Sequence, residues 1–236
     1  MISVVMPDSG PLISLALAGR LDLLDRFNSQ ILITDVVKIE LLEAPFQTPD
    51  QEAISKWIDS RGNRIRVVET VSGGLMRKTL ELLDYVPEEE RRRHYREIRI
   101  RDVGESSIRD LADEIRGGLT RDSTGLVLFE DRRVMKMDFG PHVRRMSTWS
   151  FALALEAMQV IPSAEGMFNQ IGRAGRSAGR LAFDRKGAEA KEDFAGSYDL
   201  SGLDAPDRPD QHGISTEDNE SDNASAEWLK GSESDN

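Results

Sequence analysis

Residues 2–11, Ile-Ser-Val-Val-Met-Pro-Asp-Ser-Gly-Pro, are the stretch that decides the fold. Residues 2–6 are short, apolar and rich in β-branched side chains, which is typical of a buried strand in a parallel sheet. Residues 8–11 then read as a strand-to-helix turn, because Pro11 suits the first helical position and Asp8 or Ser9 can cap the helix. The chain is therefore expected to open with a strand followed by a helix.

The same alternation continues through residue 172. Further strands are expected at residues 30–33, 65–68 and 126–129, with a short fifth strand at 142–146. Helical patterns lie between and after them, at 12–17, 21–27, 36–41, 50–60, 75–85, 87–100, 104–116, 132–138, 149–160 and 163–172. This order predicts an α/β fold, a three-layer α/β/α sandwich with a central parallel sheet and helices on both faces.

Composition excludes several classes of protein. The chain of 236 residues has no cysteine, so disulfides, zinc–thiolate sites and cysteine nucleophiles are excluded. No apolar run is long enough to cross a bilayer, and no basic stretch precedes the first strand as it would in a signal peptide. We expect a cytoplasmic protein that does not associate with membranes.

The net charge of −11 is concentrated at the end of the chain. Residues 184–236 contain 15 acidic and 5 basic residues, which leaves 27 acidic and 26 basic residues in 1–183. Ser, Asp, Glu, Gly, Asn and Pro dominate this last stretch, as is typical of a disordered acidic tail. We therefore predict one folded domain at 1–183, with a charged helical segment at about 75–101, and a disordered tail at 184–236.

Four acidic residues, Asp8, Glu40, Glu105 and Asp131, are placed where a parallel sheet would bring them to one edge. Asp8 and Asp131 follow apolar strands, and Glu40 and Glu105 lie in the first turns of helical patterns. Glu105 also shares the inward stripe of its helix with Ile108 and Leu111. Each residue has a plainer interpretation: a helix cap for Asp8, an exposed position for Glu40, the helix dipole for Glu105, and a capped turn with a local salt bridge for Asp131.

Taken together, the four positions favour a metal site. The functional crevice of an open α/β sheet lies outside the carboxyl ends of its strands. Carboxylates gathered there repel one another unless a divalent cation neutralises them. An all-oxygen set of this kind suits Mg²⁺ or Mn²⁺.

The chain resembles the PIN-domain nucleases, and most closely a group of PIN proteins expected to bind nucleic acid. The matching stretches are residues 4–13, 33–41, 104–108 and 126–133, in this order, and the resemblance covers about residues 1–172. It differs in having a longer stretch between Glu40 and Glu105, the pair Glu130-Asp131 where the family often has two aspartates, and the tail.

The resemblance implies a PIN fold and an Mg²⁺- or Mn²⁺-dependent endoribonuclease, a hydrolase of RNA phosphodiester bonds. Asp8, Glu40, Glu105 and Asp131 would be the catalytic and metal-binding residues. Thr148 matches a Ser or Thr often found near that site, although Ser147 competes for the role. The resemblance also suggests the toxin of a toxin–antitoxin pair, with an antitoxin protein as partner, and we expect a homodimer.

Two groups of arginines are candidate RNA contacts. Residues 91–101 contain Arg92, Arg93 and Arg96, which can bind phosphates, and Tyr95, which could stack on a base. The alternative is a solvated helix with i, i+4 ion pairs between residues 88 and 92 and between 89 and 93. Arg173, Arg176 and Arg180 form either a second basic rim or a frayed helix end.

Two other functions compete with the nuclease hypothesis. A PIN fold that has lost catalysis could act as an RNA- or protein-binding module. A phosphoacceptor domain also places an aspartate after a strand, but the Asp-x-Asp pattern of related hydrolases is absent, because Ser9 and Gly10 follow Asp8. Metal-dependent cleavage separates the enzyme from the binding module.

Overall fold

The computed structural model describes residues 1–43, 48, 50–98, 102–120 and 122–186. They contain a six-stranded sheet in the order β3-β2-β1-β4-β5-β6. The strands are β1 (Ile2–Pro7), β2 (Gln30–Thr34), β3 (Ile65–Val68), β4 (Thr124–Phe129), β5 (Val143–Ser147) and β6 (Asp184–Lys186). β1 to β5 are parallel and β6 is antiparallel to β5, so the prediction of a parallel α/β sheet is confirmed.

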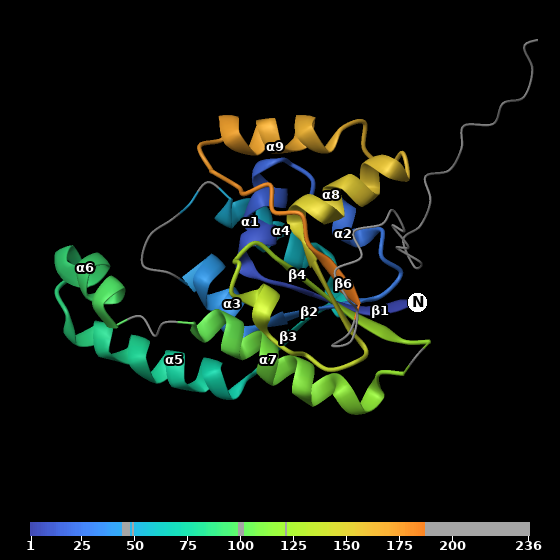
Figure 1. Cartoon of the computed structure of the whole chain (residues 1–236). Coiled ribbons are helices and arrows are strands. Elements are labelled where there is room, and N and C mark those ends of the chain that lie inside the picture. Colours follow the sequence, from blue (N-terminus) through green and yellow to red (C-terminus); the bar gives the residue numbers. More distant parts are fainter. Residues whose placement is uncertain (44–47, 49, 99–101, 121, 187–236) are drawn as a thin grey trace, which may run out of the picture. The chain divides into compact units, whose positions relative to one another are not determined.

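Helices cover both faces of the sheet (Figure 1). One face carries α1 (Ser9–Leu17), α2 (Asp22–Asp25), α4 (Gln51–Ser60), α8 (Thr148–Ala157) and α9 (Ala164–Arg173). The other carries α5 (Val71–Glu81) and α7 (Val103–Ile115), with α3 (Asp35–Lys38) beside them. Short helices η2 (Gly62–Arg64), η4 (Arg116–Gly118) and η5 (Val134–Lys136) join these elements. The result is the expected three-layer sandwich.

The side chains of β4 show how one apolar strand builds both layers. Leu126 and Leu128 pack into the core under α1, α8 and α9, whereas Val127 and Phe129 pack toward α7. Successive side chains of a strand point to opposite faces, so a continuous apolar run is needed where both faces are covered. The continuous apolar sequence of residues 126–129 therefore predicts a central strand of the sheet.

The chain order reverses between β1 and β4. From β1 the chain moves outward through β2 to β3, and it then returns to β4 on the other side of β1. Pro7 pairs with Leu128, so the two strands end at the same level. This is the topological switch point at which α/β sheets form their crevice.

The sixth strand lies beyond the boundary placed after residue 183 by the sequence analysis. Arg144 on β5 is buried, and its guanidinium forms an ion pair with Asp184 on β6. Asp-Arg-Lys at 184–186 has no apolar pattern that would predict a strand. The sheet thus extends to residue 186, and the remaining expected tail, 187–236, lies outside the described residues.

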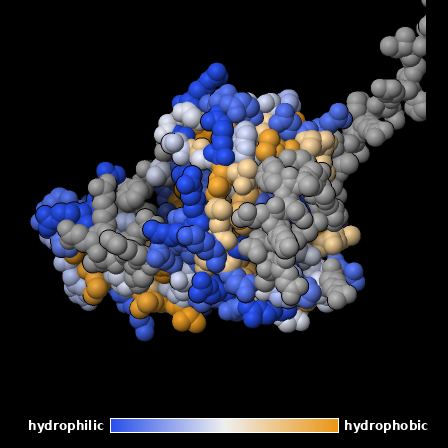
Figure 2. Space-filling view, in the orientation of Figure 1, coloured by the Kyte–Doolittle hydropathy of each residue, from blue (hydrophilic) through white to orange (hydrophobic). Residues whose placement is uncertain are grey.

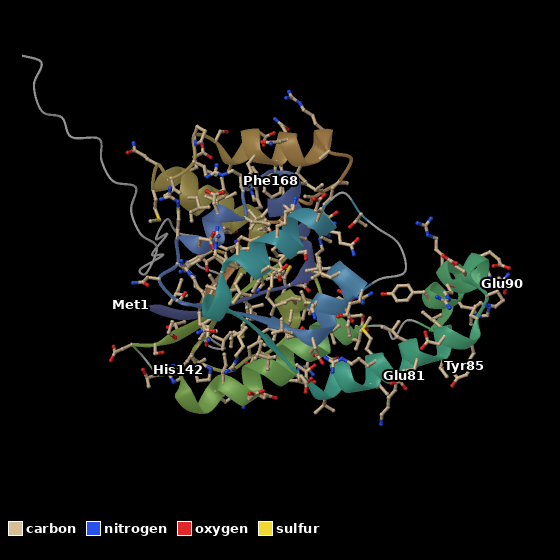
Figure 3. The ribbon with its side chains drawn as sticks, turned by 180° about the vertical axis from the view of Figure 1, so that it is seen from behind. Met1, Glu81, Tyr85, Glu90, His142 and Phe168 are labelled. Carbon is tan, nitrogen blue, oxygen red and sulfur yellow. The ribbon has the colours of Figure 1, made fainter. Side chains whose placement is uncertain are left out.

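A helical arm follows β3. It consists of α5, η3 (Leu82–Tyr85) and α6 (Glu88–Ile98), and Figure 3 shows Tyr85 and Glu90 at its end. Val71, Leu75, Leu82 and Tyr85 are exposed along it, and apolar side chains are visible there at the surface, at the lower left of Figure 2. Within the described residues, no helix combines the length and the apolar character needed to cross a membrane.

Candidate active site

Asp8 is positioned by both strands at the switch point. Its backbone N–H donates to the carbonyl of Leu128 on β4, at 2.9 Å, which continues the pairing of β1 with β4 by one residue. Its carboxylate caps α1 and accepts a hydrogen bond from the N–H of Ser9 at 2.8 Å. The helix cap predicted for Asp8 is therefore confirmed, and Asp8, which is only 8% exposed, also presents a carboxylate at the end of β1.

Glu40 reaches the same place from the neighbouring strand. It lies in η1 (Ile39–Glu43), a π-helical segment that continues α3 after β2. π-helical turns are rare and are frequent at functional sites. A methyl group built on Gly104 would lie 3.7 Å from both carboxylate oxygens of Glu40 and 4.0 Å from Oδ1 of Asp8. The start of α7 therefore approaches both acids closely.

Glu105 follows Gly104 in the first turn of α7. Its side chain is largely buried, and its Oε1 lies 3.7 Å from the guanidinium of Arg133, which also pairs with Asp102. Arg133 is well exposed, so solvent screens this ion pair. The inward position predicted for Glu105 from the helix stripe agrees with its burial.

The structure places the two acids after β4 differently. Glu130 lies beside α1, with its Cβ 3.0 Å from a methyl group built on Gly10. Its Oε2 accepts a hydrogen bond from Arg176 at 2.9 Å, while Oε1 is buried without a hydrogen-bond partner. Asp131 is exposed, and its Oδ1 accepts a hydrogen bond from the N–H of Arg133 at 2.9 Å. The turn interpretation of Asp131 thus agrees with the structure, and its catalytic role stays a prediction.

The pKa of Asp8 is shifted by its surroundings. The pKa of its carboxyl is raised to about 7, mainly by burial and also by the charges of Glu40, Glu105 and Glu130, against the lowering effect of the Ser9 N–H. The electrostatic group around Asp8 therefore contains three predicted residues, Asp8, Glu40 and Glu105, together with Glu130. Of the pair Glu130-Asp131, only Asp131 was predicted as a site residue, although Glu130 directly follows the buried strand.

This raised pKa predicts how stability depends on pH in the absence of divalent cations. Because the folded state holds a proton on Asp8 that the unfolded chain releases near pH 4, folding stability falls as pH rises from about 4 to about 7. The loss is at most about 4 kcal/mol, since each pKa unit corresponds to about 1.4 kcal/mol. Urea unfolding in EDTA across this range measures the loss. A wild-type curve that matches that of an Asp8→Asn variant at every pH would contradict the assignment.

The donor chemistry of the group suits a hard divalent cation. All its donors are carboxylate oxygens, and the buried Oε1 of Glu130 lacks the partner that a buried acceptor needs. Within the described ranges, no three acidic or histidine side chains stand close enough together to enclose an ion as they are. The residues therefore fit Mg²⁺ or Mn²⁺ in chemistry, and closing a ligand shell requires side-chain movement.

The two hydroxyl residues after β5 have different partners. Ser147 caps α8, and its Oγ accepts a hydrogen bond from the N–H of Ser150 and donates to the carbonyl of Leu181. Thr148 is buried, and its Oγ1 donates to the carbonyl of Phe129, at 3.4 Å, at the end of β4. The Thr148 hydroxyl is therefore hydrogen-bonded to the last residue of β4, which directly precedes Glu130.

The predicted RNA-binding arginines lie on α6. Arg92 and Arg93 are exposed, whereas the side chain of Arg96 lies outside the described residues. Tyr95 is only 5% exposed, so stacking of its ring on a base would require α6 to move. The expectation for Tyr95 is therefore wrong for this conformation, because the ring packs inward on an otherwise charged helix.

Comparison with known proteins gives one family. Residues 4–114 match a family model described as DUF3368: PIN domain. The matched region begins in β1 and ends in α7, so it contains Asp8, Glu40 and Glu105. No curated protein and no solved structure matches the chain.

Proposed function

Because this chain belongs to the PIN-domain family through residues 4–114, we propose that it is a metal-dependent endoribonuclease that hydrolyses RNA phosphodiester bonds. PIN domains are generally nucleases, and the fold is nuclease-like. The observation that carries the proposal is the gathering of Asp8, Glu40, Glu105 and Glu130 at the switch point of the sheet. Four carboxylates in one crevice are costly without a cation, so the site is built for something other than stability.

In this proposal Asp8, Glu40 and Glu105 hold Mg²⁺ or Mn²⁺ together with an acid from the end of β4, Glu130 or Asp131. When bound, such an ion stabilises the charge that develops on the scissile phosphate and lowers the pKa of a bound water. A carboxylate left outside the ligand set orients the attacking water and accepts its proton. Thr148, attached to the end of β4, is proposed to position this edge of the site or the RNA.

The two acids after β4 can be compared directly. We expect Glu130→Gln to lower the rate of metal-dependent RNA cleavage by at least about 10-fold, as the loss of groups that support metal sites does. Its Oε1 is buried and unpartnered, and glutamine still offers an oxygen to Arg176. Cleavage of a labelled RNA with Mn²⁺, at equal concentrations of folded protein, measures the change.

Asp131→Asn is the matched variant in this comparison. A comparable loss in Asp131→Asn would support the assignment of Asp131 from sequence, and a loss in both variants would place both acids in the site. Full activity of Glu130→Gln would remove Glu130 from the proposal. Cleavage that persists in excess EDTA would contradict the proposed metal dependence.

Two features support proposals about partners. Arg92 and Arg93 on α6 remain proposed RNA contacts, with Arg96, because exposed arginines bind phosphates. The exposed apolar side chains of the helical arm, Val71, Leu75, Leu82 and Tyr85, suit a protein partner, and we propose a second copy of this chain there. An antitoxin protein, and with it a toxin role, is the alternative occupant.

A catalytically inactive, RNA- or protein-binding PIN fold is the second candidate function. The absence of a closed metal-ligand set among the described residues favours it. It predicts RNA binding without any metal-dependent cleavage. The cleavage assay with Mn²⁺ and with EDTA therefore separates the two functions.

A further inference from the structure

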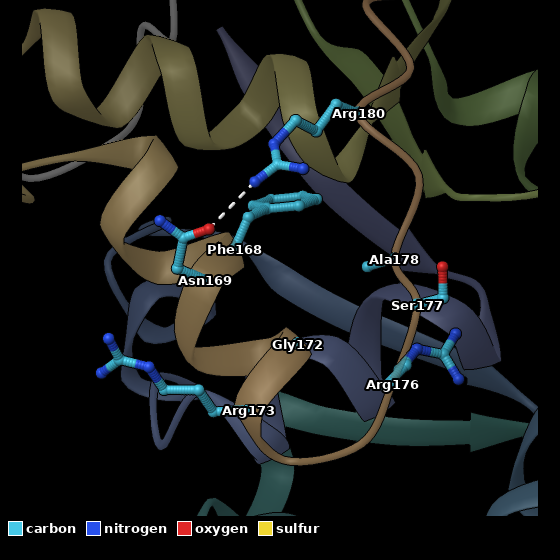
Figure 4. Close-up of a pocket in the computed structure, with 8 residues that line it drawn as sticks. All are labelled: Phe168, Asn169, Gly172, Arg173, Arg176, Ser177, Ala178 and Arg180. Carbon is cyan, nitrogen blue, oxygen red and sulfur yellow. Dashed lines mark hydrogen bonds between the residues drawn. The ribbon is translucent and has the colours of Figure 1, made fainter.

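The segment that follows α9 forms a basic pocket together with the end of that helix. The pocket has a volume of about 530 Å³ and is lined by Phe168, Asn169, Gly172, Arg173, Arg176, Ser177, Ala178 and Arg180. Figure 4 shows Asn169 and Arg173 on α9, with Arg176 and Arg180 on the segment that passes it. Its three arginines are those for which the sequence allowed two interpretations, a second basic rim or a frayed helix end.

Two of the three arginines of this pocket form ion pairs, Arg176 with Glu130 at 2.9 Å and Arg180 with Glu165 at 2.6 Å. Of the described residues that line it, three are arginines and none is acidic. Arg180 is held by hydrogen bonds to Glu165 and to the side-chain carbonyl of Asn169, so the segment is fixed rather than frayed. Arg173 is exposed in the last turn of α9. Arg173 thus adds an exposed guanidinium group beside two ion-paired arginines, and a guanidinium group suits phosphate oxygens.

Arg176 joins this pocket to the acidic group. Its Nη2 donates to Oε2 of Glu130 at 2.9 Å, and its Nε donates to Oγ of Ser14 at 3.1 Å. A second pocket, also of about 530 Å³, has Glu40 among its lining residues. Arg176 and Ser177 line both pockets. The two pockets therefore adjoin at Arg176 and Ser177, and Glu40 is the member of the acidic group that lines the second one.

We propose that the pocket of Arg173, Arg176 and Arg180 binds a backbone phosphate of the RNA next to the one that is cleaved. This inference rests on the proposed ribonuclease function. Carboxylates repel the phosphates of an approaching strand, and cations beside them offset this repulsion and fix the register of the strand. Adjoining positive and negative pockets would then hold one strand, with its neighbouring phosphate on the arginines.

The alternative for Arg173 is purely structural. A cation in the last turn of a helix interacts favourably with the helix dipole, typically by less than about 1 kcal/mol. That role affects stability and leaves RNA affinity unchanged. Thermal unfolding of each variant, measured beside RNA binding, separates the two roles.

The test measures binding in EDTA, so it requires neither metal nor cleavage. A fluorescently labelled single-stranded RNA oligonucleotide is titrated with the full chain by fluorescence anisotropy over a range of NaCl concentrations. For Arg173→Ala we expect the salt dependence, the slope of log affinity against log salt, to become shallower by about 0.7, equivalent to about fivefold weaker binding at 0.1 M salt. Arg173→Lys should keep the slope, because it keeps the charge. Arg109→Ala, which removes an exposed arginine from α7 on the opposite layer, is the matched control.

The outcomes separate this inference from the proposed function. Unchanged affinity and slope in Arg173→Ala would overturn the inference, while metal-dependent cleavage by the wild type would leave the nuclease proposal standing. The expected loss of RNA affinity in Arg173→Ala, together with a wild-type protein that does not cleave RNA, would support the inference and contradict the proposed nuclease function. Equal losses in Arg173→Ala and Arg109→Ala would show unspecific charge attraction and overturn it. A mononucleotide that binds as tightly as the oligonucleotide, with the same loss in Arg173→Ala, would assign the pocket to free nucleotides and also overturn it.

Discussion

An Asp8→Asn variant is expected to keep its fold and to lose more than about 100-fold of its metal-dependent RNA cleavage, because changes even in groups that only support metal ligands cost 10–100-fold. Asparagine retains a side-chain oxygen that can accept the N–H of Ser9, so the cap of α1 survives. It removes the buried charge around which Glu40, Glu105 and Glu130 are gathered. The measurement is initial cleavage rate with Mn²⁺, beside a circular dichroism spectrum.

The same variant should be more stable than the wild type at pH 7 in EDTA. The wild-type chain must either protonate Asp8 or place its charge among the three glutamates, and asparagine avoids both. Asp59→Asn, an exposed aspartate on α4, is the control and should change neither cleavage nor stability appreciably. Wild-type cleavage rates in Asp8→Asn would remove Asp8 from the catalytic site. A loss of fold would instead show that its role is structural.

Gly73→Ala is expected to lower the free energy of unfolding by about 3 kcal/mol, at the upper end of the cost of overpacking. A methyl group on Gly73 would overlap the carboxylate of Asp35. This carboxylate is buried and accepts hydrogen bonds from the N–H of Val36 at 3.1 Å and from Oγ1 of Thr70 at 2.8 Å. Moving it leaves these donors unsatisfied, and each hydrogen bond to a charged group is worth about 1.5–3 kcal/mol.

Gly74→Ala provides a control one residue away on the same helix. A methyl group there meets nothing within 4 Å, so alanine should raise stability, by up to about 1 kcal/mol, through its better helix propensity. Urea unfolding of the two variants at one pH gives the comparison. Equal effects of the two substitutions on the free energy of unfolding would show that the Asp35 side chain moves aside without loss of stability. That result would contradict the expected overpacking.

Much of the fold is predictable because strong local patterns coincide with it. The apolar run before Asp8 and the run at 126–129 are each buried on both faces, so they predict central strands directly. The stripe of Ile108 and Leu111 places Glu105 on the inner side of α7. Since parallel strands end at one edge, the position of the acidic group follows from strand order alone.

The finer choices depend on contacts that a linear pattern does not encode. Glu130 and Asp131 both follow β4, but only Glu130 turns inward. It does so beside Arg176, which lies 46 residues later and donates a hydrogen bond to it. The inward ring of Tyr95 on a charged helix likewise has no periodic signal. β6 was overlooked because an edge strand needs only backbone pairing and one ion pair, that of Arg144 with Asp184.

The antiparallel strand β6 also governs how the chain behaves toward its neighbours in concentrated solution. Without it, β5 would present a free row of backbone donors and acceptors, which is a template for edge-to-edge aggregation. β6 covers this row with only three residues, and all of them are charged. Natural sheets protect their edges with short, charged strands of this kind. A shortened protein that is meant to lack the acidic tail should accordingly end after Lys186 rather than after Phe183, because residues 184–186 pair with the edge of β5.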